Sequence, residues 1–538
     1  MLVSALERFG LAVSNLTAEP SPSAAVHDNQ RVMVVTDLTI SASSPTDPFS
    51  SNTLEPRKWH CVDKELYLHT GRERAWLYIA VAEKKDLTAS DLVISDIRVG
   101  EYDPSAGSDP TWDMRPGGVW VLKRNCTDDI ESLVTGVDVL FGTDAVDPRP
   151  EWTLKGRPSR ASLYGTARQT GDQIYLKRNY RSEKMANSSL FRSPILMVTG
   201  VGVCNDAIDA SGCPLPESEA DPLTVRFLGG ILDAEKPDLV LLTGDQLHHD
   251  IPDSQTTLFK VVAPMIERSI PYAAVFGNHD DEGTYAMSRA TQMELLQDLP
   301  FSLCQPGPEQ IDGVGNYYLQ IFDRAPSKRP LSTLYLLDSH GQISDKVPFL
   351  GYSWIKQSQI DWFTATSRAL RQAREKDSPG SNLHMSMAFF HIPFPEYGDR
   401  HLVMRGGHRR EPTEGPKLNS HFYDALSKEG IVAVGCGHDH VNDFCGSLPD
   451  WKTDSIPKTA PWLCYTGGSG FGGYCSYGEN RYYRRVRVWE LDTTTGSIKT
   501  WKRVEYNENR VDELTLVHDG AVVPPSNGTD QGTVTPEL

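Results

Sequence analysis

Positively charged residues are in the minority in this chain of 538 residues, because 53 Lys and Arg stand against 71 Asp and Glu and leave a net charge of -18. Proteins that bind nucleic acids usually present a basic surface to the phosphate backbone. We therefore expect no nucleic-acid partner. Hydrophobic residues make up 39% of the chain, so a chain of this length should bury a large core in two or more domains.

Cysteine is sparse and irregularly placed. The nine cysteines are odd in number and form no Cys-x-x-Cys pair, which argues against a zinc ribbon and against a dense disulfide framework. Glu7 and Arg8 interrupt the apolar positions of residues 1–15, so we expect neither a cleavable signal peptide nor a membrane span there. These absences lead us to expect a cytoplasmic protein.

The composition changes along the chain and predicts five segments. They are residues 1–56, 57–142, 143–194, 195–518 and 519–538. The first is rich in Ser, Thr, Ala and Pro and should be loosely ordered apart from one strand-like run, and the second has the short β-type runs of a β-rich accessory domain. The third is rich in Pro, Arg, Ser and Gly and suggests a linker, the fourth is the main domain, and the last is a polar, disordered tail.

Within the main domain, apolar β-type runs alternate with helical patterns, which predicts a layered α/β fold. Strands are expected at residues 195–198, 239–243, 272–276, 317–322, 333–337, 384–390 and 431–436, and helices near 221, 255–268, 359–376 and 420–428. Ligands of such sheets gather beyond the carboxyl ends of the strands. The residues that directly follow these strands are therefore the candidates for a functional site.

Metal-binding residue types follow four of these strands. They are Gly244-Asp245, Gly277-Asn278-His279-Asp280, His391 and Gly437-His438-Asp439-His440. Each motif alone has a structural explanation, such as a turn or a helix cap. Four strand ends that all carry Asp, Asn or His together predict a two-metal site.

The residue types suggest roles for the side chains. Asp245 can bridge two cations, Asn278 can supply an amide oxygen, and His391, His438 and His440 can supply imidazole nitrogens. This ligand set suits manganese, iron or zinc.

His279 is then available to protonate a leaving oxygen, and Asp280 or another carboxylate could orient its imidazole. We therefore take His279 and Asp280 as the candidate catalytic residues.

These motifs resemble the calcineurin-like metallophosphoesterase superfamily. A closer resemblance, to the fungal branch related to the yeast dosage-dependent cell-cycle regulator phosphatase, rests on three stretches, residues 275–283, 385–395 and 436–442. The resemblance implies a layered β-sandwich flanked by helices, two divalent metal ions, and hydrolysis of a phosphorylated substrate such as a phosphomonoester or a phosphoprotein by metal-activated water. Residues 35–145 also resemble the N-terminal region of that branch.

One motif of the superfamily is missing. Its Asp-x-His at the end of the first strand is absent, because Thr199-Gly200-Val201 follows Val198 at once. The resemblance then leaves the first metal only Asp245 and His440, whereas the second metal keeps its full set of ligands. The second ligand set is Asp245, Asn278, His391 and His438.

Substitute carboxylates for the first metal could come from Asp206 or Asp209 in the loop that follows, although such a rescue demands precise geometry. The resemblance therefore implies an impaired phosphoesterase, and the alternative is a catalytically inactive regulatory or binding protein on the same fold. His248 stands where purple acid phosphatases use a tyrosine, three residues after Asp245, which argues against a ferric tyrosinate site.

Overall fold

The computed structural model describes most of the chain and divides it into two compact units. The described residues are 11–12, 32–41, 58–66, 75–99, 112–116, 119–129, 133–141, 145–150, 152–156, 159–161, 167–169, 173–178, 193–198, 211, 213, 220–248, 251, 253–284, 286–322, 330–343, 351–377, 383–449, 460–470, 476–477 and 480–525. The first unit comprises Met1–Glu19, Asn187–Ile251 and Pro264–Leu538, and the second comprises Pro20–Ala186 and Pro252–Ala263.

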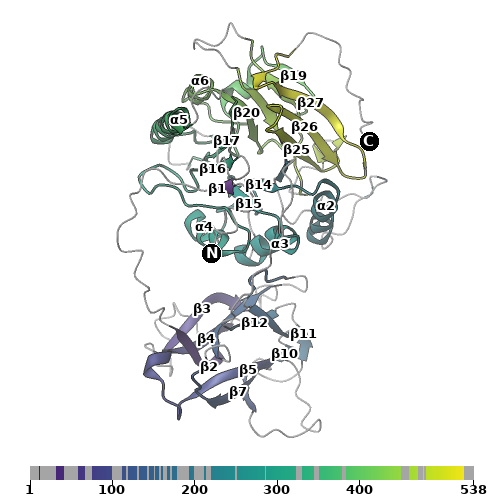
Figure 1. Ribbon diagram of the computed structural model, residues 1–538. Helices are drawn as coiled ribbons and strands as arrows, with labels where there is room; N and C mark the ends of the chain where they lie inside the picture. Colours follow the sequence, from purple (N-terminus) through teal and green to yellow (C-terminus); the bar gives the residue numbers. More distant parts are fainter. Residues whose placement is uncertain are drawn as a thin grey trace. The chain divides into compact units, whose positions relative to one another are not determined.

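Two large sheets form the centre of the first unit (Figure 1). The eight-stranded sheet has the order β1 (Leu11–Ala12), β16 (Tyr317–Phe322), β17 (Pro330–Leu336), β18 (Met385–Phe389), β20 (Ile431–Cys436), β22 (Trp462–Tyr465), β21 (Cys445–Ser447), β19 (Val403–Arg405). The seven-stranded sheet has the order β15 (Tyr272–Val275), β14 (Leu239–Thr243), β13 (Ser193–Val198), β25 (Arg485–Asp492), β26 (Ser497–Val504), β27 (Val511–His518), β28 (Ala521–Val522). In both sheets, neighbouring strands that precede the candidate residues run parallel.

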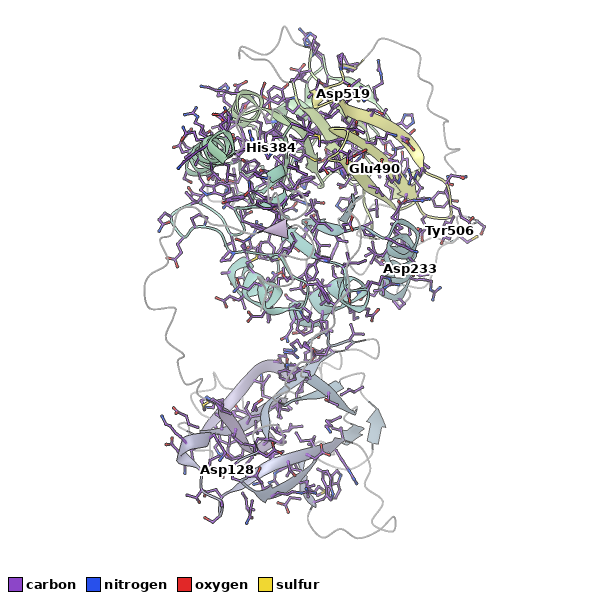
Figure 2. All side chains as sticks on the ribbon, viewed as in Figure 1. Asp128, Asp233, His384, Glu490, Tyr506 and Asp519 are labelled. Atoms are coloured by element: carbon purple, nitrogen blue, oxygen red, sulfur yellow. A yellow bond between two sulfur atoms is a disulfide. The ribbon has the colours of Figure 1, made fainter. Side chains whose placement is uncertain are left out.

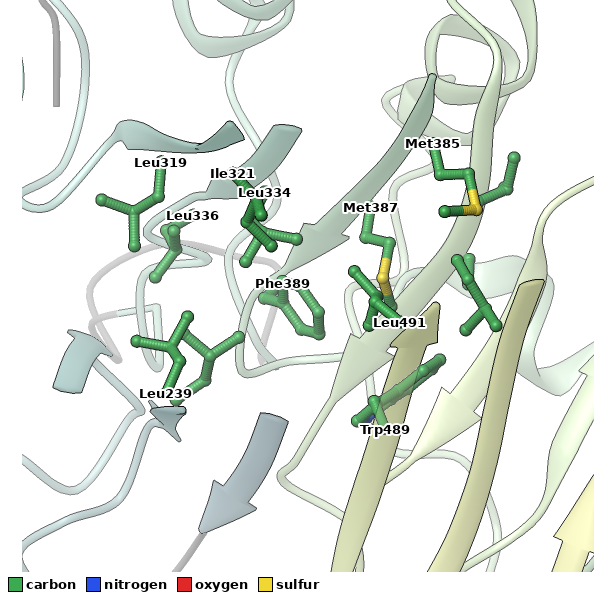
Figure 3. Packing of buried hydrophobic residues seen from close by; sticks show 14 of the residues in the cluster. Leu239, Leu319, Ile321, Leu334, Leu336, Met385, Met387, Phe389, Trp489 and Leu491 are labelled. Carbon is green, nitrogen blue, oxygen red and sulfur yellow. The ribbon is translucent and has the colours of Figure 1, made fainter. Parts of the chain in front are cut away.

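The two sheets pack face to face around a shared apolar core, part of which Figure 3 shows. Because side chains alternate across a strand, Met385, Met387 and Phe389 of β18 all enter this core. The ring of Phe389 meets Trp489 of β25 edge to face, with 6.1 Å between ring centroids. This contact joins one sheet to the other close to the strand ends.

Helices α5 (Gln357–Asp377) and α6 (Phe422–Lys428) cover the outer face of the eight-stranded sheet (Figure 1). The other helices of the described chain are α2 (Ala220–Glu235), α3 (Ser254–Glu267) and α4 (Arg289–Asp298). Ile360 and Phe363 lie on one face of α5 and pack against Phe422 of α6 and Phe390, which follows β18. One face of α5 is therefore buried, and the predicted layered α/β fold is confirmed.

The second unit contains smaller antiparallel sheets around its own core. Their strands are β2 (Met33–Ser41), β3 (Trp59–Leu66), β4 (Ala75–Glu83), β5 (Leu92–Val99), β6 (Trp112–Arg115), β7 (Val119–Asn125), β8 (Val134–Leu140), β9 (Trp152–Gly156), β10 (Ser159–Ala161), β11 (Ala167–Gln169) and β12 (Gln173–Arg178). A 3-10 turn, Lys84–Asp86, follows β4. This unit is β-rich, as its short runs predict.

The structure differs from the predicted linker at 143–194. Strand β12 pairs with both β8 and β9, so this part of the chain completes a sheet of the β-rich unit instead of forming only an exposed connection. The many Pro, Arg and Ser residues outweighed the short alternating runs of Trp152–Gly156 and Gln173–Arg178 in the sequence interpretation. In the N-terminal segment, β2 matches the strand-like run predicted there.

A buried carboxylate links the β-rich part of the second unit to residues 252–263 of the same unit. Asp138 accepts hydrogen bonds from Lys64 Nζ at 3.2 Å, Arg149 Nη2 at 2.9 Å and Gln255 Nε2 at 2.9 Å. Burial alone would raise the pKa of Asp138, but the Lys64 and Arg149 charges lower it. The Arg149 guanidinium also lies over the Phe259 ring, 4.9 Å from its centroid. The first turns of α3 therefore belong to the β-rich unit.

No helix in the described part of the chain is long and apolar enough to cross a membrane. One disulfide, Cys445–Cys464, joins directly opposed positions of β21 and β22.

Removing this disulfide should lower stability, because the bond closes a loop with a sequence separation of 19 residues. Loop-closure entropy for that length corresponds to about 3 kcal/mol. We expect calorimetry to show a lower melting temperature for the Cys445→Ala/Cys464→Ala variant than for the oxidised protein. Dithiothreitol should lower the melting temperature of the wild type only, and an equal effect on both proteins would contradict this account.

His384 should make stability depend on pH. Burial, and then the charges of Arg374 and Arg371, lower the pKa of His384 to about 4, whereas an unfolded histidine titrates near 6.5. The unfolded chain therefore binds the proton more tightly, so stability should fall as the pH drops from about 6.5 to about 4, by up to about 3 kcal/mol.

The His384→Gln variant lacks this titration. We expect the melting temperature of the wild type, relative to the variant, to decrease between pH 7 and pH 4.5. Parallel pH profiles for the two proteins would show that His384 is not held neutral in the folded state.

Candidate metal centre

The loops after β14, β15, β18 and β20 bring the predicted residues to one place. One possible ligand atom from each of Asp245, His391 and His438 lies within 4.8 Å of the others. Nε2 of His440 is 4.0 Å from Oδ2 of Asp245. Because β14 belongs to one sheet and β18 and β20 to the other, the centre lies at the carboxyl edge where the two sheets meet.

Two glycines allow the loops to approach this closely. A Cβ on Gly244, whose φ is +95°, would overlap the ring of His391, and a Cβ on Gly277 would overlap the carboxylate of Asp245. Asp245 and His438 themselves adopt left-handed φ values of 52° and 71°. Non-glycine residues rarely occupy this region, and strained positions of this kind are common at functional sites.

His391 is completely buried, and its tautomer follows from its contacts. Its Nδ1 lies 2.8 Å from the carbonyl oxygen of Thr243, which can only accept, so Nδ1 donates. In the neutral ring, Nε2 then carries a lone pair. This nitrogen lies 2.9 Å from Oδ2 of Asp245, so two acceptors face one another unless a proton or a cation lies between them.

Four buried polar atoms at the centre have no hydrogen-bond partner in the described structure. They are Asp245 Oδ2, Asn278 Oδ1, His391 Nε2 and His438 Nε2. Buried polar atoms are almost always satisfied, and a group of acceptor atoms that is not satisfied calls for a cation. Oδ2 of Asp245 and Nε2 of His391 are close enough to share a proton, but the angles between the two groups are not those of a hydrogen bond. The donor set therefore fits a bound divalent metal.

The pKa shifts at the centre also favour a bound divalent metal. Burial would raise the pKa of Asp245, but His391 holds it well below its usual range. Burial and then the charge of His391 lower the pKa of His438 well below its usual range, and burial lowers that of His440. Without a cation, Asp245 raises the pKa of His391 against the effect of burial. One carboxylate and two neutral imidazoles are the forms that bind metals.

Asp280 joins two of the loops instead of contacting His279. Its carboxylate accepts hydrogen bonds from the backbone nitrogens of Gly277 at 2.6 Å, Asp245 at 2.9 Å and Leu247 at 3.0 Å. Burial and then the nearby charge of Asp245 raise the pKa of Asp280 to about 6. Asp280 therefore fixes the backbone on both sides of Asp245.

The carboxylate that contacts His279 is Glu282. Nδ1 of His279 lies 2.5 Å from Oε2 of Glu282, and the backbone nitrogen of His279 donates to Oδ1 of Asp245 at 2.9 Å. The alternative that another carboxylate orients this imidazole thus matches the structure, and the Asp280 alternative does not. In the sequence, the spacing of three residues between His279 and Glu282 in a polar turn could have indicated this contact. The His279 side chain keeps 19% of its surface exposed and can reach a ligand from solvent.

Arg289 braces the same loop from helix α4. Its guanidinium donates to the carbonyl oxygen of Gly277 at 2.7 Å and to the carboxylates of Asp338 at 2.5 Å and Asp281 at 3.1 Å. These acceptors occupy the guanidinium, so Arg289 supports the loop that carries Asn278. A single sequence does not reveal this role, because the partners lie up to 49 residues away.

Tyr352 is a further residue of the centre that sequence patterns do not reveal. Its ring meets the His438 ring edge to face, with 4.4 Å between centroids. Residues Gly341 and Ser353 pair through their backbones and place Tyr352 in a turn beside the centre. Asp439, between the two candidate histidines, instead accepts a hydrogen bond from Tyr465 at 2.5 Å and stabilises the loop.

The missing Asp-x-His would follow β13, which ends at Val198. Asp206 and Asp209, the substitutes considered for the first metal, lie outside the described residues. Among the described residues, only Asp245, Asn278, His391, His438 and His440 provide the predicted ligands.

Comparisons with known proteins agree with this geometry. A family model described as calcineurin-like phosphoesterase matches residues 201–442, starting just after β13. The chain is 36% identical to Phosphatase DCR2 of Saccharomyces cerevisiae over 413 residues, which cover 72% of this chain and 67% of that protein. It is 38% identical to a protein of Arabidopsis thaliana named "Probable inactive purple acid phosphatase 29", over 58% of this chain and 82% of that protein.

A solved structure of a dimetal phosphatase from Danio rerio aligns with 61% of this chain and 99% of its own, at 14% identity and a TM-score of 0.38. The matched family model and the extent of the sequence identity to the yeast and plant relatives establish the family. This chain therefore belongs to the calcineurin-like phosphoesterases.

Proposed function

We propose that the protein is a metal-dependent phosphoesterase that hydrolyses phosphomonoesters or phosphoproteins with reduced turnover. The observation that supports this proposal best is the set of four buried atoms without hydrogen-bond partners, on Asp245, Asn278, His391 and His438. Three of these residues, Asp245, His391 and His438, each place a possible ligand atom within 4.8 Å of the others. Such a group has no stable role in an apolar core, whereas it suits a divalent ion.

Asp245, Asn278, His391 and His438 would hold one divalent ion, and the nitrogen and oxygen donors suit manganese, iron or zinc. When bound, the ion activates water and neutralises the charge of a phosphate. The hydrogen bond from His391 Nδ1 to Thr243 fixes the ring with Nε2 toward the ion. Asp280 keeps the two flanking loops in register.

His279 would donate a proton to the leaving oxygen. Its ring is partly exposed, and Glu282 holds Nδ1, which orients the imidazole for proton transfer. The backbone hydrogen bond of His279 to Asp245 keeps this imidazole at a constant place relative to the ligand carboxylate. Asp280 contributes to catalysis through the loop that it braces.

The reduced turnover follows from the ligands available for a first ion. Only Asp245 and His440 remain of that set, and two ligands are too few for a stable metal site. The loss of one electrostatic stabiliser of a transition state commonly lowers turnover by about 10²–10³-fold.

An inactive regulatory or binding protein is the second candidate. The absence of Asp-x-His after β13 favours it, and two Arabidopsis thaliana relatives, at 38% and 35% identity, are named probable inactive purple acid phosphatases. The two candidates share the fold and one metal site, and they differ in measurable turnover.

The structure leads us to expect one tightly bound divalent ion per chain. His391→Ala removes a central ligand and should lower manganese affinity by at least about 100-fold, because the other ligands are left with an incomplete site. Isothermal titration calorimetry and elemental analysis measure this change. His518→Ala alters an exposed histidine at the end of β27 and should leave both affinity and metal content unchanged.

Two ions bound to the wild type with equal affinity would contradict the loss of the first site. Unchanged manganese affinity in His391→Ala would contradict the assignment of this centre.

Turnover of p-nitrophenyl phosphate in manganese should be low but measurable. His279→Ala should abolish it while metal content stays constant, because His279 is assigned to proton transfer and not to metal binding. His401→Ala, on a loop outside the centre, serves as the matched control.

Insertion of Ser-Asp-Leu-His between Val198 and Thr199 should raise turnover by about 10²-fold or more, because it restores the ligands of a first ion. Absence of turnover in the wild type together with strong turnover in the insertion variant would favour the inactive regulatory protein. Equal turnover in both would show that the first ion has ligands elsewhere.

A further inference from the structure

A second polar cavity lies away from the metal centre, beside the carboxyl ends of helices α5 and α6. Its volume is about 220 Å³, and its lining includes Tyr335, Arg371, Arg374, His384 and Lys428. Pockets for drug-sized ligands occupy about 300–1,000 Å³, so this cavity has the size for a small ion or metabolite. His384, which is labelled in Figure 2, lies directly before β18.

Positive charge is in excess in this cavity. Glu429, its buried carboxylate, is already shared between Arg368 at 3.0 Å and Arg371 at 2.5 Å. Arg374 makes no hydrogen bond and no ion pair with any residue that the structure describes. Burial and then the charge of Arg371 lower the pKa of Arg374, against the opposing effect of Tyr335 and Glu375. Lys428 likewise has no acidic partner among the described residues.

The remaining polar groups of the cavity add no negative charge. Nδ1 of His384 lies 3.2 Å from the carbonyl oxygen of Pro330 and therefore donates, and its Nε2 then accepts from Thr333 at 3.1 Å. His384 is thus neutral and satisfied. The hydroxyl groups of Ser386 and Tyr335 also line the cavity and can donate hydrogen bonds to an anion.

A purely structural role for these cations is the alternative to ligand binding. Basic side chains in the last turn of a helix interact favourably with its carbonyl groups, and Arg374 and Lys376 both lie in the last turn of α5. That role requires only exposed side chains, as in Lys376. It does not account for Arg374, which lies partly buried in a cavity next to a second guanidinium.

The cavity and the metal centre lie at opposite ends of the same parallel strands. His384 and Ser386 stand at the start of β18 and Gly430 stands before β20, whereas His391 and His438 follow these strands. A strand of five residues spans roughly 17 Å, so the cavity is a separate site and not an extension of the metal centre.

We propose that this cavity is a second anion site, in which Arg374, with Arg371 and Lys428, binds a phosphate group. Guanidinium groups suit phosphate oxygens because they offer paired, charged donors in a fixed plane. The group could belong to free inorganic phosphate or to a small phosphorylated molecule, and the chemistry at the cavity is the same for both.

Titration of the full-length protein with inorganic phosphate, after removal of metals with a chelator, tests this proposal. Metal removal prevents phosphate from binding at the metal centre, so the result does not depend on the proposed enzymatic function. We expect saturable binding by calorimetry, weakened at least about 10-fold in Arg374→Ala, because one charge-assisted contact is lost. Arg374→Lys should recover part of the affinity.

Lys376→Ala is the matched control, because it removes a cation from the same helix turn outside the cavity. Circular dichroism melting identifies any variant that fails to fold, and alanine at an exposed edge of a helix is well tolerated. Absence of phosphate binding to the wild type, or equal affinity in the wild type and Arg374→Ala, would overturn the proposal.

A parallel titration with glycerol phosphate separates the two sources of the phosphate group. Binding of glycerol phosphate that also depends on Arg374 supports a small phosphorylated ligand, and binding restricted to inorganic phosphate supports the free ion.

Discussion

The face-to-face packing of the two central sheets is the constraint on which the metal centre depends. Asp245 and Asn278 follow strands of one sheet, and His391 and His438 follow strands of the other. Their positions are therefore set by the apolar core, including the contact of Phe389 with Trp489. Close packing resists small displacements, so a core that is remote from the site keeps the candidate ligand atoms close to one another.

Local hydrogen bonds then fix the loops that carry the candidate ligands. Asp280 satisfies three backbone nitrogens around Asp245, Arg289 holds the Gly277 carbonyl, and Thr243 fixes the ring of His391. None of these partners needs to touch an ion or a substrate. The residues that hold the backbone are thus different from the residues that supply lone pairs. The lone pairs face one another without a donor between them, which costs free energy that a bound cation would offset.

Much of the main domain could be predicted from the sequence, because its central strands are continuous apolar runs and its candidate ligands directly follow them. The five predicted ligands come from positions that the structure places at one edge, although their roles remain a proposal. The pairing of β12 with β8 and β9 could not be predicted, since short alternating runs in a Pro-rich segment give a weak signal. Tyr352 was missed because its approach to His438 depends on a long-range turn.

The membership of residues 252–263 in the β-rich unit has a consequence for how the protein can be divided. Gln255 donates to Asp138, Thr256 accepts from the backbone of Phe141, and Arg149 lies over Phe259. A shortened protein that starts after the β-rich region would keep helix α3 but lose all three partners and expose its first turns. Because the two units interleave along the chain, no single cut yields either one intact.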